Sequence, residues 1–483
     1  MRLLLSLWLL SASALHAQPY AHIQSALETF LSDPVLRNAS VGVVVVDTET
    51  GATVVSYEGN RSLIPASSLK AITTATALSV LGADYTFRTE LQYSGATDAE
   101  GTLHGNLYIK GYGDPTLGSE WLDSADDMPT ILAKFAHAVR AAGINRIDGH
   151  IIGDGSFFPS SPVPGSWQWE DMGNYYGAGA FGLNLHENWY WLDFQQNPQL
   201  DSTPVVKATR PAVPFIHVEN LVTSAPRGTG DNAYIYGAPF RHHVTVRGTI
   251  PVGKGSTFTI KGAVPDPVLF TAYQLTEKLK SQGTEVTKLP RALFVPTDDE
   301  ATRNVIYTHT SPPLRDIVWE ANHESVNLYC EVMLKTLSLQ LRQSSEYDTA
   351  AAVVRDYWQI KGINTEGMSL RDGSGLSARN AVTARQMADI LRLTANDPTI
   401  FPDFYQSLST GAEGTLRGMF RGKKAYTKIR AKSGSMSGVR SYSGYATTPE
   451  GKLLAFSVIA NNFTCKSSVM RRKTERLMES FCE

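Results

Sequence analysis

The chain has 483 residues and a formal net charge of only −2 at neutral pH. That length exceeds one ordinary hydrophobic core, so we expect two or three domains. Charged residues make up 19% of the chain, and its longest run of lysine and arginine is 471–473, which argues against nucleic acid or an anionic membrane surface as the partner.

The first residues have the three parts of a secretory signal peptide. Arg2 precedes a mostly apolar run over 3–10, and small residues fill much of 11–17. The apolar run is about ten residues long, well short of the roughly 20 that span a bilayer. We therefore expect cleavage after Ala17 rather than an uncleaved anchor, and no transmembrane segment in the mature chain. The protein is expected to be periplasmic or otherwise extracytoplasmic, and either soluble or loosely associated with a membrane.

The mature chain is predicted to begin with an amphipathic helix, followed by a hairpin and a second helix. The apolar face of the first helix carries Ile23, Leu27, Phe30 and Leu31. The β-branched runs 43–46 and 53–56 flank a stretch of turn residues, which predicts the hairpin. The second helix is expected over 67–81, because Gly82 suits a left-handed cap after it.

Residues 86–265 alternate short strand patterns with Gly and Pro turns, so we expect a mostly β insert there. Helical periodicity then returns. Helices are predicted over 270–279, 314–321, 328–337, 350–360 and 383–393, the last with Thr383 and Gln386 at capping-box spacing. Near the C-terminus, three antiparallel strands are expected over 428–432, 442–447 and 453–459, before a final helix over 467–477.

These elements predict an α/β (α+β) fold in which both ends of the chain build one antiparallel sheet with helices on its faces. The expected division is a domain of residues 18–85 together with 266–483, and an inserted part of residues 86–265.

The sequence does not point to a metal or a cofactor. The histidines show neither an H-E-x-x-H motif nor clustering with cysteines, and the glycines at 111–118 break the spacing of a dinucleotide fingerprint. Three cysteines are too few for a disulfide framework. Cys330 falls at apolar helical spacing and is expected in the core. Cys465 and Cys482 flank the last helix and are either paired or reduced, since the sequence does not give their Cα separation.

Ser67 and Lys70 lie in the first turn of the predicted second helix, and their i to i+3 spacing places both side chains on one face. A serine hydroxyl is a weak nucleophile until a base removes its proton, and a lysine serves as base only if burial or a second cation lowers its pKa. The positive end of the helix also favours negative charge developing on a bound substrate. The pair therefore predicts a nucleophile beside its base, although S-x-x-K alone arises easily by chance.

Two further motifs make the pair specific. Ser325-Val326-Asn327 lies between two predicted helices, and Lys432-Ser433-Gly434 lies on a predicted strand that a hairpin follows. Taken singly, these serines and lysines would more often be surface or capping residues. Taken together and in this order, they are counterparts of the S-x-x-K, S-D-N and K-T-G motifs of penicillin-binding proteins and class A β-lactamases.

The chain resembles the class C low-molecular-mass penicillin-binding proteins, which are D-alanyl-D-alanine carboxypeptidases and endopeptidases. That family carries extra domains between its first two motifs, and the long separation of Ser67 from Ser325 is similar. Residues 105–117, 372–377 and 414–416 also resemble the family, so the resemblance covers nearly the whole mature chain. It implies a serine DD-peptidase fold related to that of the β-lactamases.

The motifs also assign roles. Neutral Lys70 would accept the proton of Ser67 as Ser67 attacks the carbonyl of the penultimate D-alanine of a peptidoglycan stem peptide. Ser325 would pass a proton to the leaving amine while Asn327 orients Lys70. Lys432 would bind the terminal carboxylate and help keep Lys70 neutral. The other substrate-binding candidates on this strand are Ser433, Gly434, which leaves room for substrate, and Ser435, whose backbone N–H joins that of Ser67 in an oxyanion hole.

The resemblance further implies that β-lactams acylate Ser67 and that the insert reads the substrate. Asp154, a turn residue by default, is the candidate to bind the amine of a diamino acid such as meso-diaminopimelate, and Arg379 the candidate for its carboxylate. Relatives often place the arginine immediately after the stretch matching 375–377, whereas Ala378 intervenes here. Val326 and Ser433 replace the more usual Asp and Thr.

Two alternatives stay open from the sequence: a β-lactamase or esterase with the same motifs, and a catalytically silent protein that binds peptidoglycan. The balance between carboxypeptidase and endopeptidase action also stays open, as does the formation of a homodimer.

Overall fold

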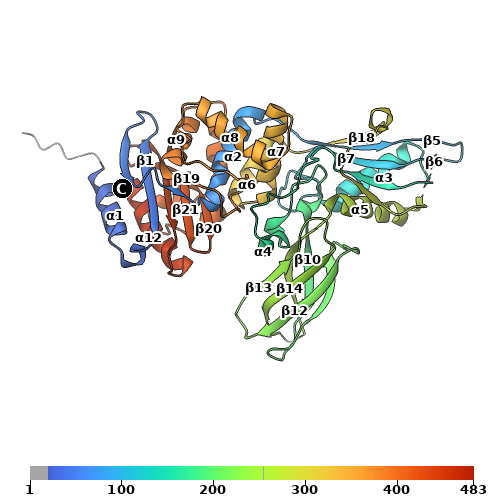
Figure 1. The fold of residues 1–483 in the computed structure, drawn as a ribbon, viewed down its shortest axis with the longest axis horizontal. Helices are drawn as coiled ribbons and strands as arrows, with labels where there is room; N and C mark the ends of the chain where they lie inside the picture. The colour runs from blue at the N-terminus through green and yellow to red at the C-terminus, as the bar shows by residue number, and fades with distance from the viewer. Residues whose placement is uncertain (1–19, 254) are drawn as a thin grey trace, which may run out of the picture.

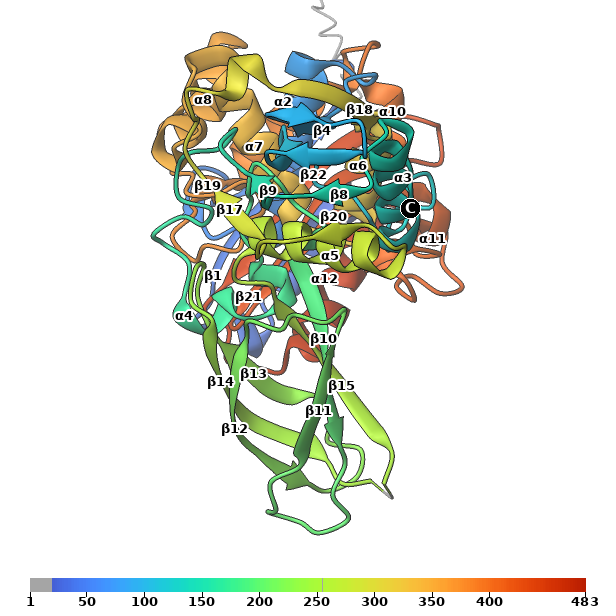
Figure 2. The same ribbon diagram turned by 90° about the vertical axis from the view of Figure 1, so that its right-hand side faces the viewer.

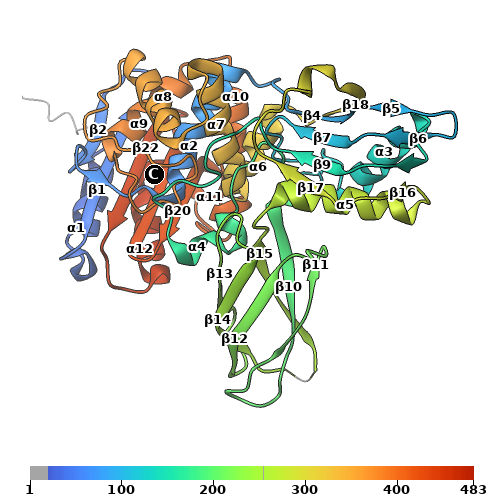
Figure 3. The ribbon, with the colours of Figure 1, turned by 45° about the vertical axis from the view of Figure 1, so that its right-hand side comes forward.

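The computed structural model describes residues 20–253 and 255–483, so the expected signal peptide over 1–17 lies outside the described residues. Figure 1 shows three lobes: a lobe built from both ends of the chain, an arm of sheet and helices that extends from it, and a smaller β lobe. Turned views in Figure 2 and Figure 3 show the β lobe projecting away from the arm.

One five-stranded antiparallel sheet forms the centre of the first lobe. Its strands run in the order β2 (Thr53–Tyr57), β1 (Ser40–Asp47), β22 (Leu453–Asn461), β21 (Val439–Thr447) and β20 (Ile429–Met436). β1 pairs with β22 from Ser40 opposite Asn461 to Asp47 opposite Leu454. The prediction that both ends of the chain build one sheet is therefore confirmed.

Alternate side chains of β1 supply two hydrophobic cores. Val43 and Val45 face the core formed with α1 (Ala21–Leu31) and α12 (Ser467–Glu479). Val44 and Val46 face the opposite core, which includes apolar residues of α2 (Lys70–Leu81) and α9 (Ala384–Ala395). All four valines are fully buried, and each contributes roughly 1.5–3 kcal/mol by leaving water.

Four further helices of this lobe pack around α2: α6 (Leu314–His323), α7 (Asn327–Arg342), α8 (Tyr347–Ile360) and α10 (Phe401–Ser407). The short helix α11 (Ala425–Lys428) packs on β20 and β21 instead. The capping box is present, since the Thr383 hydroxyl accepts from the Gln386 N–H and the Gln386 side chain accepts from the Thr383 N–H. Cys330 on α7 is fully buried in the core, as predicted.

The arm contains a five-stranded sheet in the order β17 (Arg291–Leu293), β9 (Ile151–Asp154), β7 (Leu107–Gly111), β4 (Arg88–Tyr93) and β18 (Asn304–Thr310). A second sheet has the order β16 (Glu285–Val286), β8 (Arg146–Ile147), β6 (Thr102–His104) and β5 (Ala96–Thr97). Helices α3 (Met128–Ala141) and α5 (Pro267–Ser281) pack on each other and on these strands.

The arm corrects two predictions. β18 pairs with β4 along its whole length, from Asn304 opposite Tyr93 to Thr310 opposite Arg88. The insert therefore continues past residue 265 to about residue 310, and the helix over 267–281 packs on β9 and β17 rather than on the first lobe. The insert is also less purely β than predicted, because α3 is a helix of 14 residues begun by an Asp127 cap.

The β lobe combines two three-stranded sheets. One has the order β11 (Val205–Arg210), β10 (Trp189–Gln195) and β15 (Thr257–Ala263), and the other β12 (His217–Ala225), β14 (His243–Pro251) and β13 (Asn232–Tyr236). Alternate residues Tyr190, Leu192 and Phe194 of β10 are fully buried in the core between them. The short helix α4 (Trp169–Met172) lies between this lobe and the first (Figure 3).

Short elements complete the fold. β3 (Ser62–Leu63) pairs with β19 (Val382–Thr383). The 3-10 turns are η1 (Pro34–Leu36), η2 (Ala66–Leu69), η3 (Tyr175–Gly177), η4 (His186–Asn188), η5 (Glu300–Thr302), η6 (Gly414–Leu416) and η7 (Ser480–Cys482). Within residues 20–253 and 255–483, no helix is both long enough and apolar enough to cross a membrane. Cys465 and Cys482 are free thiols in this structure.

Candidate active site

Ser67 lies in the 3-10 turn η2, immediately before α2 begins at Lys70. The expected helix over 67–81 thus starts with a tighter turn. In a 3-10 turn the side chains at i and i+3 eclipse each other, and Lys70 Nζ lies 3.1 Å from Ser67 Oγ. The tighter winding therefore brings the two groups closer in line than α-helical spacing alone requires.

Lys70 is fully buried and makes three hydrogen bonds. Its Nζ contacts Ser67 Oγ at 3.1 Å, Asn327 Oδ1 at 2.6 Å and the Ser374 carbonyl at 2.8 Å. Asn327 Nδ2 donates to the Tyr176 carbonyl at 2.7 Å, which orients the amide so that its oxygen faces Lys70. Burial lowers the pKa of Lys70, against the smaller opposing effect of Cys330, Glu331 and Asp372.

These partners determine where a neutral Lys70 directs its lone pair. The Asn327 oxygen and the Ser374 carbonyl can only accept, so they take the two N–H bonds of the neutral amine. Of the three partners, only the Ser67 hydroxyl can donate. The remaining lone pair therefore faces the Ser67 proton, which is the arrangement that a serine nucleophile with a lysine base requires.

Two buried carboxylates hold the loop that supplies the Ser374 carbonyl. Glu331, one helical turn after Asn327 on α7, accepts from the Gly373 N–H at 3.1 Å and the Ser374 N–H at 2.8 Å. Asp372 accepts from the N–H groups of Gly375 and Ser377. Burial, and then the charge of Asp372, raises the pKa of Glu331 to about 7. The stretch 372–377 thus positions Lys70 through its backbone.

Lys432 on β20 is also fully buried. Its Nζ donates to Ser325 Oγ and to the Ser433 carbonyl, both at 3.0 Å. Burial lowers the pKa of Lys432 well below its usual range, and the neighbouring Lys70 charge adds to this effect. Burial is the largest cause of the lowered pKa of both lysines. The expectation that Lys432 helps keep Lys70 neutral stays a prediction.

Gly434 is required by the protein itself. A Cβ at this position would lie 2.5 Å from the Pro65 carbonyl oxygen and 2.8 Å from the Ser68 nitrogen. Gly434 therefore allows β20 to pack closely against the turn that carries Ser67. The expectation that it also leaves room for substrate stays a prediction. Ser435 is exposed and lines the neighbouring cavity, whereas Ser433 is half-buried.

A cavity of about 620 Å³ opens over these groups. The first two motifs contribute Ser67, Ser325, Val326 and Asn327 to its lining, and β20 contributes Ser435. The insert contributes Trp121, Gln168, Glu170, Asp171, Tyr175, Tyr176, Glu187, Trp189 and Tyr234. With Glu324, four carboxylates line the cavity, and the described lining residues include neither lysine nor arginine. The cavity is thus suited to a substrate that carries an amine away from the reacting carbonyl.

Comparison with known proteins agrees with this geometry. Residues 23–481 match the D-Ala-D-Ala carboxypeptidase 3 (S13) family. The chain belongs to that family. A D-alanyl-D-alanine carboxypeptidase of Actinomadura sp. (strain R39) is 30% identical over 449 residues, which cover 91% of this chain and 81% of that protein. The D-alanyl-D-alanine carboxypeptidase DacB of Haemophilus influenzae is 23% identical and covers 92% of this chain and 90% of its own.

The fold of this S13 peptidase is shared by a solved relative. The crystal structure of penicillin-binding protein 4 (dacB) from Haemophilus influenzae superposes with a TM-score of 0.79 at 20% identity, covering 95% of this chain and 97% of the other. The resemblance inferred from the motifs is confirmed, and the chain is a hydrolase of the serine-peptidase class.

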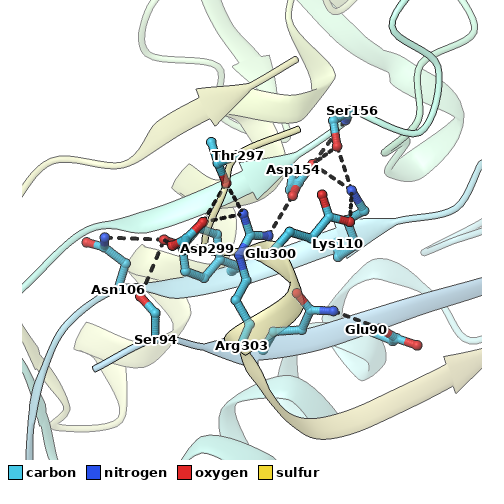
Figure 4. Close-up of polar contacts among 12 residues, drawn as sticks. Glu90, Ser94, Asn106, Lys110, Asp154, Ser156, Thr297, Asp299, Glu300 and Arg303 are labelled. Atoms are coloured by element: carbon cyan, nitrogen blue, oxygen red, sulfur yellow. Dashed lines mark hydrogen bonds and ion pairs between the residues drawn. The ribbon is translucent and has the colours of Figure 1, made fainter. Parts of the chain in front are cut away.

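Asp154 does not reach the active-site cavity of the S13 peptidase. It lies in the arm, fully buried, where its carboxylate contacts Arg303 at 2.7 Å and Lys110 at 3.3 Å and accepts from the Ser156 hydroxyl at 2.6 Å (Figure 4). Burial alone would raise the pKa of Asp154, but the hydrogen bonds from Ser156 and Arg303 and the charge of Lys110 outweigh it and lower the pKa. Asp154 is thus occupied within the protein and unavailable to a substrate amine.

Arg379 is exposed and is absent from the residues that line the cavity, whereas its neighbour Ala378 lines it. Ala378, between residues 375–377 and Arg379, thus lies at the cavity wall where the arginine was expected. The acidic residues that do line the cavity, Glu170 and Asp171, escaped the sequence analysis because α4 has only four residues and no motif. Only the folding of the insert against α7 brings them to Ser67.

Proposed function

We propose that this S13 peptidase cleaves D-Ala-D-Ala termini, D-Ala-diamino acid cross-links of peptidoglycan, or both, through an acyl-enzyme on Ser67. The observation that carries this proposal is the set of three partners of Lys70, which leaves its lone pair facing the Ser67 hydroxyl. Family membership supports the substrate class.

Acylation follows from the geometry. Neutral Lys70 accepts the Ser67 proton as Oγ attacks the carbonyl of the penultimate D-alanine. The negative charge that develops on the carbonyl oxygen is stabilised by the backbone N–H groups of Ser67 and Ser435, each worth roughly 3 kcal/mol. Collapse of the tetrahedral intermediate breaks the C–N bond and leaves an ester on Ser67.

Ser325 and Lys432 serve the leaving group. Ser325 Oγ lies beside Lys432 Nζ, so the hydroxyl can pass a proton to the departing amine and recover one from the lysine. A bound substrate carboxylate favours the charged form of Lys432 and reverses the depression of its pKa. After acylation, Lys70 loses to solvent the proton that it took from Ser67, and Lys432 regains one, so both lysines return to their starting forms. Water then attacks the ester carbonyl. Lys70 takes a proton from that water and returns it to Ser67 Oγ as the ester C–O bond breaks.

The acidic cavity replaces Asp154 as the site for the second amine. Glu170 and Asp171 on α4 line the cavity that contains Ser67, so they are placed to bind the side-chain ammonium of a diamino acid. This supports substrates that extend beyond the terminal dipeptide and favours them over the small bicyclic ring of a β-lactamase substrate.

β-Lactams are expected to acylate the same serine. One structure of the Haemophilus influenzae protein is a complex with a β-lactam. We also propose export: the segment over 1–17 has the form of a signal peptide, which places the enzyme in the periplasm or another extracytoplasmic compartment, where its substrate lies.

The test is covalent labelling of purified wild type and Ser67→Ala with a fluorescent penicillin, together with mass spectrometry of muropeptides after digestion. The wild type is expected to carry the label for many minutes and to release D-alanine or divide cross-linked dimers. Ser67→Ala should do neither. Label that persists in folded Ser67→Ala would refute the nucleophile, and rapid turnover of penicillin without any change in muropeptides would establish a β-lactamase instead.

A further inference from the structure

A second pocket lies beside the active-site cavity and shares Trp121 with it. Its volume is about 350 Å³. Residues of the insert before α3 form one wall, and residues of α6 and α10 form the other. The lining residues that matter below are Trp121, Asp123, Asp316, Trp319, Glu320 and Asp403.

Glu320 on α6 is the unusual member of this pocket. Its side chain is only 4% exposed, yet among the described residues its carboxyl group has neither a hydrogen-bond donor nor a cation as partner. A buried carboxylate without a partner costs several kcal/mol, so proteins normally pair such groups. Asp154 in the arm, with Arg303 and Lys110, shows how this chain satisfies a buried carboxylate elsewhere.

The surroundings of Glu320 disfavour its negative charge, which either a proton or a bound cation can neutralise. Burial, and then the neighbouring carboxylates Glu324, Glu187 and Asp123, raise the pKa of Glu320 to about 8. Asp316 on the same helix accepts from the Ser124 hydroxyl at 3.2 Å, and Asp403 faces the pocket from α10. Arg315 lines the pocket as well, but it forms its ion pair with Asp84.

The walls favour an organic cation. Trp319 stacks on His323 with ring centroids 3.9 Å apart and an interplanar angle of 12°, so its ring is held in place and 40% of it stays exposed. The Trp319 ring, beside carboxylates, can bind an ammonium group through cation–π and ionic contacts together. The Trp121 ring already has Lys261 Nζ at 4.9 Å from its centroid. Among the described residues, no group of three His, Cys, Asp or Glu side chains has the geometry to hold a metal ion.

We propose that this pocket is a second binding site, distinct from the cavity over Ser67, for an organic ammonium group that pairs with Glu320 and Asp403. The ammonium group comes either from a neighbouring peptide of the cell wall or from a free amine. The site does not depend on the acylation chemistry, because none of its carboxylates contacts Ser67, Lys70 or Lys432.

The experiment measures binding of 1,5-diaminopentane by isothermal titration calorimetry to full-length protein whose Ser67 has been acylated by penicillin. Glu320→Gln is nearly isosteric and should weaken the binding at least about tenfold, because one charge-assisted contact worth more than about 1.4 kcal/mol is lost. Asp403→Asn, at the more open side of the pocket, should weaken it less. Glu170→Gln is the matched control, since it removes one carboxylate from the active-site cavity, and it should leave this binding unchanged.

Penicillin labelling of Glu320→Gln at the wild-type rate would show that the variant is folded. Its melting temperature without amine should equal or exceed that of the wild type, because an unpaired buried carboxyl is gone. Equal affinity of wild type and Glu320→Gln, or a loss confined to Glu170→Gln, would overturn the proposal. If penicillin does not label Glu320→Gln, the test uses Asp403→Asn instead. An affinity of Asp403→Asn for diaminopentane equal to that of the wild type would then overturn the proposal.

A second titration identifies the source of the amine. A stem tripeptide with a free diaminopimelate side-chain amine is compared with the same peptide acetylated at that amine. Glu320-dependent binding of the free form alone would assign the pocket to a peptide of the cell wall. If diaminopentane binds and neither peptide shows Glu320-dependent binding, the pocket is assigned to a free amine.

Discussion

Replacing Asn327 with aspartate tests whether a neutral Lys70 is the base. The substitution keeps the shape of the side chain but puts a carboxylate where the amide oxygen now lies, 2.6 Å from Lys70 Nζ. With an effective dielectric constant of about 20, Coulomb's law gives about 6 kcal/mol for that pair, or roughly 4 pKa units as an upper bound. Because an anion stabilises the ammonium form, the pKa of Lys70 must rise.

A raised pKa removes the neutral amine at neutral pH and restores it only as the pH rises. We therefore expect Asn327→Asp to acylate at least about 100-fold more slowly than wild type near pH 7, and the deficit to shrink toward high pH. The measurement is the second-order rate constant for labelling by a fluorescent penicillin from pH 6 to 10.

Asn327→Ala is the control, because it removes the same oxygen without adding charge. It should slow acylation at all pH values without displacing the profile toward high pH. If Asn327→Asp is acylated at the wild-type rate at pH 7, or if the pH–rate profiles of both variants have the same shape, Lys70 does not act as a neutral base.

Three further substitutions separate the remaining roles. Lys432→Ala should lose far more activity on a peptide with a free C-terminal carboxylate than on its amidated analogue, and equal losses on steady-state assay of both would contradict the anchoring role. Asp154→Ala leaves Lys110 and Arg303 with only the more exposed carboxylates of Glu300 and Asp299 as ionic partners, so it should lower stability by about 3 kcal/mol at most; thermal unfolding and acylation by penicillin are measured together, and an unchanged melting temperature would contradict the buried pairing. Asp171→Asn should lower kcat/KM on diamino-acid-containing peptides at least about tenfold while acylation by penicillin stays near wild type, since one charged contact is removed from the substrate; a parallel fall in both rates would assign Asp171 to the fold.

The sequence was sufficient to predict the central sheet and the groups that meet at Ser67. Three motifs in a required order restrict one another. β1 and β22 are also easy to recognise, because a strand buried on both faces has a near-continuous apolar run. The paired positions of Lys70 and Lys432 then follow from the fold that those motifs imply.

The end of the insert could not be predicted in the same way. The pattern over 267–281 correctly indicates a helix, but helical periodicity says only that one face is buried and not which domain buries it. Pairing of β18 with β4, more than 200 residues away in sequence, is the kind of contact that no local pattern carries.

Asp154 illustrates the same limit for a single residue. An aspartate among glycines has the composition of an exposed turn, and nothing nearby in the sequence indicates that Arg303 approaches it from the far end of the insert. Conversely, Asp171 and Glu170 lie in a segment without a pattern, so only the folded arrangement brings them to the cavity.

The pairing of β1 with β22 limits the order in which the parts of this protein can fold. Residues 40–47 have no neighbour on one side until residues 453–461 have been delivered, whereas the arm and the β lobe close on sequence that lies between the first two motifs. Loop closure over such a separation is slow compared with local folding. A chain synthesised N-terminus first can therefore fold its arm and its β lobe before β22 pairs with β1. The turn that carries Ser67 packs against β20 only when the last strands have arrived.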